Sequence, residues 1–314
     1  MTKKIATREA YGEALIELGQ MDERVVVLDA DLSQSTKTAG FGKQFPQRFF
    51  NMGISEQNMM GTAAGLATTG KIPFASTFAM FATGRAFEII RNSIAYPNLN
   101  VKICATHAGI TVGEDGASHQ ALEDIACMRV IPNMTVIVPS DAVETRAVIH
   151  AMAKMEGPTY IRLGRAGLPI INDENGYNFE IGKGVQLKDG NDITIIASGI
   201  MVSQALDASK TLEAKGISAR VINIHTIKPI DKEIIIKAAE ETGVIVTLEE
   251  HNIIGGLGSA VAEIVVENRP VPMKRIGVLD TFGESGKPDQ LLQKYGLSKE
   301  NIVSTVEEML TKKL

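Results

Sequence analysis

Short apolar runs alternate along this chain with longer segments in which apolar residues recur every three or four positions. Such runs are typical of buried strands, and such periodic segments of amphipathic helices. Their alternation predicts an α/β fold with mainly parallel sheets and helices on both faces. In the first half the expected strands are 25–28, 49–52, 72–77, 101–106, 135–138 and 159–163, and the expected helices 7–18, 55–69, 82–95 and 142–154.

The alternation stops at 172–191, a stretch rich in Asn, Asp and Gly, which is typical of a connection between domains. It then resumes with expected strands 193–197, 219–224, 244–248 and 274–278, and with expected helices 202–215, 232–241, 256–267 and two more before the end. A length of 314 residues suits two α/β domains. We therefore expect a first domain of residues 1–175, a linker of 176–191 and a second domain of 192–314.

The composition argues against several classes of protein. A net charge of −5 without a basic block argues against nucleic acid as the main partner. No apolar run is long enough to span a bilayer, so no membrane partner is expected. The first residues lack the apolar stretch of a secretory signal, and the two cysteines fit a reducing compartment. We therefore expect a cytoplasmic protein, with Cys104 as a buried, inert thiol.

The first candidate for chemistry is the segment Gly-Ile-Ser-Glu-Gln-Asn at 53–58. It places Glu56 in the first turn of an expected helix, directly after a short strand. The helix dipole favours an ionised carboxylate there, which would suit a ligand nitrogen. The small residues that follow would let this helix lie close to a neighbour or a flat ligand. Taken alone, an acidic residue in a first turn is more often a plain helix cap.

Two further pieces follow at the ends of expected strands. Phe78 and Phe81 stand three positions apart at a strand-to-helix junction, and their flat faces could stack on a ring or simply pack in the core. The loop 107–120 is dense with polar residues, and ligands of α/β proteins bind at such loops. His107, Asp115 and His119 are acceptable zinc ligands in type, but their spacing matches no metal motif, so a metal site is not expected.

These three pieces, in this order, resemble the pyrimidine-binding half of transketolases, and the resemblance continues through Thr281–Leu314. The whole chain thus corresponds to the second half of a full-length transketolase. The resemblance implies thiamine diphosphate as cofactor, with Glu56 bonded to its pyrimidine N1′. It also implies that Phe78 and Phe81 pack on the aminopyrimidine, Phe81 in the stacking position. A third aromatic of many transketolases falls here at Gly84, so that side of the pocket must differ.

The resemblance further implies a sugar-phosphate site. Its Gly-Glu-Asp-Gly-x-x-His loop would place Asp115 at a sugar hydroxyl and His119 beside the reacting carbonyl, so His119 joins Glu56 as a catalytic residue. His107 matches a histidine near the sugar phosphate. The remaining matches are two arginines and a serine for the phosphate and an aspartate against the cofactor, namely Arg8, Arg165, Ser35 and Asp31. Guanidinium groups suit phosphate because they bond two oxygens at once.

One part of the family pattern is missing. Transketolases bind the diphosphate and its divalent metal through Gly-Asp-Gly followed by Asn, and neither Glu114-Asp115-Gly116 nor Asp189-Gly190-Asn191 stands in that context. The resemblance therefore implies a partner, a transketolase N-terminal subunit, that supplies Mg²⁺ or Ca²⁺ and completes an α2β2 assembly. Gly255-Gly256-Leu257-Gly258-Ser259 precedes a helix, as phosphate-binding segments do, but we interpret it as close helix packing.

The implied reaction is transfer of a two-carbon ketol unit from a ketose phosphate to an aldose phosphate. Two related enzymes are alternatives: the β subunit of a 2-oxoacid dehydrogenase and deoxyxylulose-phosphate synthase. Asp115-Gly116-x-x-His119 argues against the first, and the lead-in Val112–Asp115 with Gln120 argues against the second. An alternative of another class is a non-catalytic regulatory or assembly subunit that kept the fold.

Overall fold

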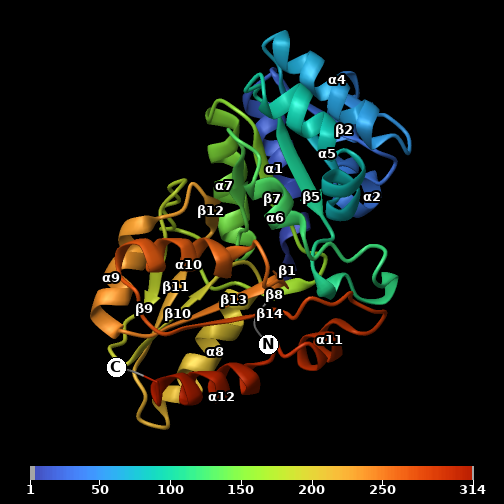
Figure 1. Ribbon diagram of the computed structural model, residues 1–314. Coiled ribbons are helices and arrows are strands. Elements are labelled where there is room, and N and C mark those ends of the chain that lie inside the picture. Colours follow the sequence, from blue (N-terminus) through green and yellow to red (C-terminus); the bar gives the residue numbers. More distant parts are fainter. Residues whose placement is uncertain (1–3, 313–314) are drawn as a thin grey trace.

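The computed structural model describes residues 4–312 and confirms the expected α/β class. Two sheets with helices on their faces form two domains, one above the other in Figure 1, with the last helices at the bottom of the view. A small third sheet joins the antiparallel strands β1 (Lys4–Ala6) and β8 (Gly167–Pro169).

The first domain contains a seven-stranded sheet of order β12-β6-β7-β5-β4-β2-β3. All of its neighbouring strands pair in parallel except β12, which is antiparallel to β6. Its strands are β2 (Val25–Asp29), β3 (Phe49–Asn51), β4 (Ile72–Phe78), β5 (Lys102–Thr106), β6 (Thr135–Ile137), β7 (Thr159–Arg162) and β12 (Thr226–Lys228).

Alternate residues of the central strands enter different cores, as the two-residue period of a strand requires. Val25 and Val27 pack with one group of helices, and Val26 and Leu28 with another. The first group is α1 (Thr7–Met21), α3 (Ala39–Gln44) and α7 (Ala142–Lys154), and the second includes α4 (Glu56–Thr68) and α6 (Asp124–Arg129). The short helices α2 (Ser33–Thr36) and α5 (Phe87–Ile89) complete this domain.

The second domain contains a five-stranded sheet of order β14-β13-β10-β11-β9. Its strands are β9 (Val185–Lys188), β10 (Ile193–Ala197), β11 (Ala219–Asn223), β13 (Ile245–Asn252) and β14 (Met273–Val278). Strand β9 lies within the stretch expected as a linker and pairs antiparallel with β11. The helices are α8 (Met201–Glu213), α9 (Lys232–Thr242), α10 (Leu257–Asn268), α11 (Pro288–Lys294) and α12 (Lys299–Leu310).

The two domains interlock. Strand β12 follows β11 of the second sheet but joins the edge of the first sheet, beside β6. One apolar core also runs through both domains, since it contains Val136 of β6 together with Ile196 of β10. Buried Arg162 of β7 donates to Asp124 at 2.8 Å and to the carbonyl of Glu250 in β13 at 2.8 Å. The domains therefore share hydrogen bonds as well as apolar surface.

The helix expected over 82–95 is irregular. It consists of a π-helical segment, Phe81–Arg85, the short α5, and a second π-helical segment, Ile90–Ala95. A π-helical turn holds one residue more than an α-helical turn and shifts the side chains that follow it. Apolar periodicity does not detect such an insertion, so the sequence predicted a regular helix here.

The glycine-rich segment before α10 is a packing feature, as interpreted from the sequence. A Cβ at Gly258 would lie 2.8 Å from atoms of Arg275 and Thr247. The N-terminus of α10 is already capped, because buried Glu249 accepts hydrogen bonds from the backbone of Leu257 at 2.7 Å and of Gly258 at 2.9 Å. A protein carboxylate thus holds the position that a phosphate would need.

Candidate cofactor and substrate site

The predicted site residues other than Arg8, which lies in α1, follow the carboxyl ends of neighbouring parallel strands, where α/β proteins bind ligands. The strands β2, β3, β4, β5 and β7 each contribute to this edge of the first sheet. In chain order these residues are Asp31 and Ser35 after β2, Glu56 after β3, Phe78 at the end of β4, His107 after β5 and Arg165 after β7.

Glu56 is the first residue of α4, and only 1% of its side chain is exposed. Its Oε2 accepts a hydrogen bond from Nη1 of Arg85 at 2.8 Å, and the same guanidinium lies over the ring of Phe81, 4.8 Å from its centroid. Arg85 was not anticipated from the sequence. The signal that could have found it is a cation four positions after Phe81, which directly precedes the helix expected over 82–95.

The aromatic pair and the two histidines form one cluster. The rings of Phe78 and Phe81 are stacked, with centroids 5.9 Å apart and an interplanar angle of 12°. His107 stacks on Phe78 at 3.8 Å, and His119 meets Phe81 edge-on at 5.4 Å. The end of β4, the π-helical segment Phe81–Arg85 and the loop 107–120 therefore meet at one aromatic surface.

A third aromatic is absent on this surface at Gly84, and the structure shows what takes its place. A Cβ at Gly84 would lie 2.6 Å from the methyl carbon of Met80. Met80 thus fills that side of the pocket, and the flexible thioether suits an irregular gap.

Arg8 connects two of the predicted positions. Its Nη1 donates to the backbone carbonyl of Ser35 at 2.9 Å and lies 3.1 Å from Nε2 of His107. Burial, with Arg8 and Arg165 nearby, lowers the pKa of His107 to about 3. The imidazole is therefore neutral at pH 7, with Nε2 accepting from Arg8 and Nδ1 donating to Oγ1 of Thr106 at 2.9 Å.

Arg165 holds the loop 107–120, and its charge acts on Arg8. Its Nη1 donates to the backbone carbonyl of Val112 and to Oε2 of Glu114, the latter at 3.2 Å. Burial and the charge of Arg165 lower the pKa of Arg8. The two positive charges repel each other, so an anion bound near both guanidinium groups would be stabilised by them.

Two predicted residues stand apart from these contacts. The backbone amide of Asp31 donates to Asn51 Oδ1 at 3.1 Å, and Asn51 Nδ2 donates to Asp31 Oδ1 at 3.2 Å. Asp115 is exposed at the end of the 3-10 turn Ile110–Asp115. Within residues 4–312, no hydrogen bond joins either aspartate to another predicted site residue.

A buried aspartate missed by sequence reasoning fixes the turn after β2. The carboxylate of Asp29 accepts from the hydroxyls of Thr36 at 2.7 Å and Thr38 at 2.9 Å, and from the backbone amide of Leu32 at 2.6 Å. These three bonds satisfy a carboxylate whose burial raises its pKa. They hold the turn that carries Asp31 and Ser35.

The second domain braces the loop that carries Asp115 and His119. Gln120 Nε2 donates to the backbone carbonyl of Glu284 at 2.9 Å. Gly116 has a φ of +75°, and a Cβ there would lie 2.5 Å from Oγ of Ser285, so both backbone conformation and space require glycine. The segment 283–288 therefore fixes one side of the candidate site.

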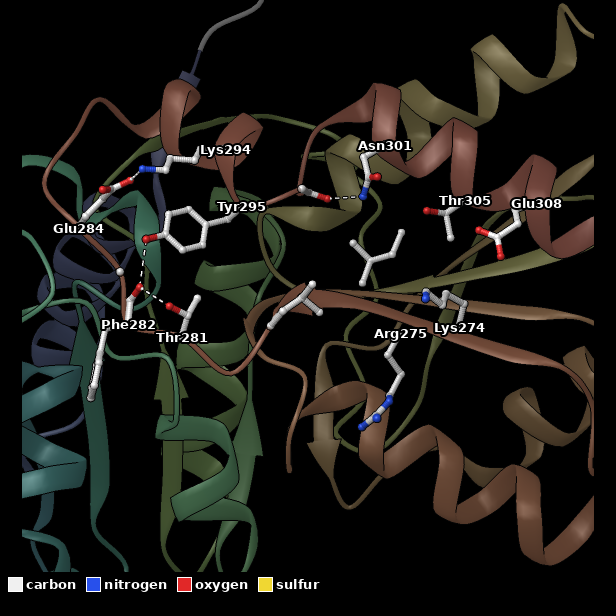
Figure 2. A pocket seen from close by; sticks show the side chains of 15 residues that line it. Lys274, Arg275, Thr281, Phe282, Glu284, Lys294, Tyr295, Asn301, Thr305 and Glu308 are labelled. Atoms are coloured by element: carbon white, nitrogen blue, oxygen red, sulfur yellow. Dashed lines mark hydrogen bonds and ion pairs between the residues drawn. The ribbon is translucent and has the colours of Figure 1, made fainter.

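Two cavities adjoin this segment. The first lies between β14, α11 and α12 (Figure 2) and has a volume of about 800 Å³. In it the hydroxyl of Tyr295 donates to the carbonyl of Phe282 at 3.0 Å. Its lining includes none of the predicted site residues. Phe282 also lines a second cavity, of about 500 Å³, which reaches Ser118 and Gln120. The second cavity is thus the one beside the loop 107–120.

Two findings concern the described residues only. No group of three or more His, Cys, Asp or Glu side chains among them is arranged to hold a metal ion. Across residues 4–312, every helix is too short or too polar to cross a bilayer.

Comparison with known proteins shows which family has this architecture. Residues 3–170 match the family described as transketolase, pyrimidine binding domain, and residues 182–302 match transketolase, C-terminal domain. The chain therefore belongs to the transketolase family and contains both of these domains. It is 58% identical over 307 residues to a putative transketolase C-terminal section of Methanocaldococcus jannaschii, with 97% of this chain and 96% of that protein covered.

Two further relatives are informative. A 6-deoxy-6-sulfo-D-fructose transketolase subunit of Clostridium sp. is 44% identical over 306 residues, with 98% of this chain and 95% of that protein covered. A solved structure described as a split gene transketolase, inactive β4 tetramer, superimposes with a TM-score of 0.91. The sequence identity is 59%, and 99% of this chain and 100% of that one are covered.

Proposed function

We propose that this chain is the C-terminal subunit of a split, thiamine-diphosphate-dependent transketolase. With an N-terminal subunit, most simply as α2β2, it transfers a two-carbon ketol unit from a ketose phosphate to an aldose phosphate in the cytoplasm. The observation that carries the proposal is the convergence of buried Glu56, the stacked pair Phe78–Phe81 and two histidines at one sheet edge.

The residues present fit the aminopyrimidine ring of the cofactor. Glu56 is a buried carboxylate at a helix N-terminus and would bond pyrimidine N1′, and the ring of Phe81 would take the flat face. When bound, thiamine diphosphate supplies a carbanion that can attack a ketose carbonyl. In this proposal Asp31 lies against the cofactor, and His119, at the edge of Phe81, lies beside the reacting carbonyl.

The residues for the sugar are of two kinds. Exposed Asp115 would contact a sugar hydroxyl, while Arg8, Arg165 and the backbone beside Ser35 surround a place suited to the phosphate. His107 is neutral and both of its ring nitrogens are already bonded, to Arg8 and to Thr106, so it would position Arg8 rather than add charge.

The diphosphate and its divalent ion would be held by the partner subunit, since the chain lacks the Gly-Asp-Gly…Asn pattern. Calorimetry with thiamine diphosphate and Mg²⁺ tests this. We expect weak binding to the isolated chain and tight binding to the two-subunit complex, because most of the cofactor's charge lies in its diphosphate. Tight stoichiometric binding to the isolated chain would refute the split-site proposal.

Substrate assays with the complex separate the alternatives. Ketose and aldose phosphates are expected as substrates, and matched 6-sulfonates test whether the arginine pair accepts another oxyanion, as the name of the Clostridium relative invites. A preference for pyruvate as donor would instead favour deoxyxylulose-phosphate synthase or a 2-oxoacid dehydrogenase β subunit. Cofactor binding without turnover of any of these donors would favour the non-catalytic alternative.

A further inference from the structure

Glu56 presents a problem that its proposed role does not solve. An ionised carboxylate that is only 1% exposed needs a partner, because an unpaired buried charge is strongly destabilising. In the described chain that partner is the guanidinium of Arg85, 2.8 Å from Oε2. In the proposed function, however, the partner of Glu56 is a nitrogen of the cofactor ring.

Arg85 also covers the second surface that this ring would use. Its guanidinium carbon lies 4.8 Å from the centroid of Phe81, within the range of a cation–π contact. A planar guanidinium that pairs with the carboxylate and lies over this aromatic ring matches both recognition features of an aminopyrimidine. The side chain and the cofactor ring would therefore compete for one place.

The two partners of this ion pair differ in their freedom to move. Arg85 is 48% exposed, so its charge can move into water at little desolvation cost, whereas Glu56 cannot. The backbone of Arg85 is held, because Gln57 Nε2 donates to its carbonyl at 3.1 Å. The segment Phe81–Arg85 is π-helical, and π-helical turns are often found at functional sites. A change of the Arg85 rotamer alone would open the position.

We propose that Arg85 is an internal placeholder: in the cofactor-free subunit it occupies the place of the cofactor's aminopyrimidine ring, and binding displaces it toward solvent. This inference rests on the proposed function. The ion pair keeps Glu56 compensated before assembly, and the cofactor then takes over both contacts. Displacement opposes binding, so Arg85 lowers the apparent affinity for thiamine diphosphate while it protects the empty site.

The first test is calorimetry of thiamine diphosphate with Mg²⁺ on the two-subunit complex, with Arg85→Met, which keeps an unbranched side chain but removes the charge. We expect binding 10- to 100-fold tighter than in the wild type, because a charged hydrogen bond no longer has to be broken. Arg85→Lys, a poorer match to carboxylate and ring, should tighten binding by a smaller factor. Arg91→Met, an exposed arginine of the next π-helical segment, is the matched control and should bind as the wild type does.

The second test is thermal unfolding of the same complexes with and without cofactor. Arg85→Met should lower the midpoint of the cofactor-free form and leave that of the loaded form unchanged, since only the empty form uses the ion pair. Weaker binding by Arg85→Met would instead show that Arg85 contacts the bound cofactor. Unchanged binding would show that Arg85 is a surface residue without influence on the site. Either result overturns the inference. A wild-type complex that binds no thiamine diphosphate would refute the proposed function itself.

Discussion

Each domain carries a buried glutamate at the N-terminus of a helix, and the two are satisfied in different ways. Glu249 of the second domain accepts two backbone amide hydrogen bonds from α10, and buried His251 lies 3.7 Å away. Glu56 of the first domain has a half-exposed side chain, Arg85, as its partner. Backbone donors of a helix cannot leave, whereas a flexible arginine can.

The contrast shows that burial at a helix N-terminus does not by itself distinguish a structural carboxylate from a functional one. What distinguishes them is whether the partner can be exchanged without unfolding. In the proposed function, Glu249 belongs to the fold and Glu56 is available to a ligand. Substitutions at the two positions should therefore affect different measurements.

Glu56→Gln should have the largest effect, and on catalysis rather than stability. The amide keeps the shape but cannot exchange a proton with the cofactor, so we expect hydrogen–deuterium exchange at the cofactor's C2 carbon to slow by about two or more powers of ten in the complex. NMR measures this step directly. Exchange at the wild-type rate would contradict the proposed role of Glu56. Glu56 and Glu249 would then no longer differ in function.

Arg165→Ala extends the comparison to an arginine whose partners lie in the loop 107–120. Loss of one phosphate partner should raise KM for phosphorylated sugars by about one to two powers of ten. Hydroxypyruvate, which carries no phosphate, should be affected much less in steady-state assays. Equal damage to both substrate classes would mean that Arg165 acts through its bond to the carbonyl of Val112.

Glu249→Gln should act on stability, with a defined pH dependence. Burial raises the pKa of Glu249 to about 7 from an ordinary value of 4.5, so its ionisation opposes folding. Its unfavourable contribution is absent below pH 4.5 and grows as the pH rises toward 7. The amide loses one of the two backbone bonds at every pH but avoids the ionisation cost.

The stability of Glu249→Gln relative to the wild type should therefore improve between pH 4.5 and 7, by roughly 1–3 kcal/mol. Chemical denaturation of the two proteins across this range measures the difference, and taking the difference cancels the titration of other groups. If the difference in the free energy of unfolding between the two proteins did not change with pH, Glu249 would be ionised over the whole range. Glu56→Gln serves as the comparison protein from the other domain.

The smallest expected effect concerns the neutral His107. Because its pKa is lowered to about 3, its NMR ring signals should not shift between pH 5 and 8. His107→Asn retains hydrogen-bonding groups and should change the pH profile of kcat/KM very little in that range. A His107 titration near pH 6.5 would mean that Arg8 and Arg165 leave the ring free to become charged.

Part of the fold and of the candidate site could be predicted from the sequence, because these features depend on local residue patterns. The strands, most helices and the loop 107–120 follow from periodicity and glycine positions. Asp141 caps α7, accepting from the Glu144 amide at 2.8 Å, and its three-residue spacing from a glutamate is a local signal for a helix start. The ion pair of Arg85 with Glu56 could not be predicted, because it joins residues 29 positions apart, whereas the spacing of Arg85 from Phe81 was a usable signal. The Glu249 cap joins the end of one strand to the start of the next helix, a contact that no sequence motif records.

Strand β12 determines where the chain can be divided into fragments. The first sheet ends in a strand donated by the second half of the chain, and the shared core and the Arg162 bonds lie beneath that junction. A fragment ending near residue 175 would expose the open edge of β6 and a bare apolar surface, both of which invite aggregation. Grafting this pyrimidine-binding half onto another protein would thus require carrying Thr226–Lys228 with it, so the transferable building block is larger than the boundary between the two sheets suggests.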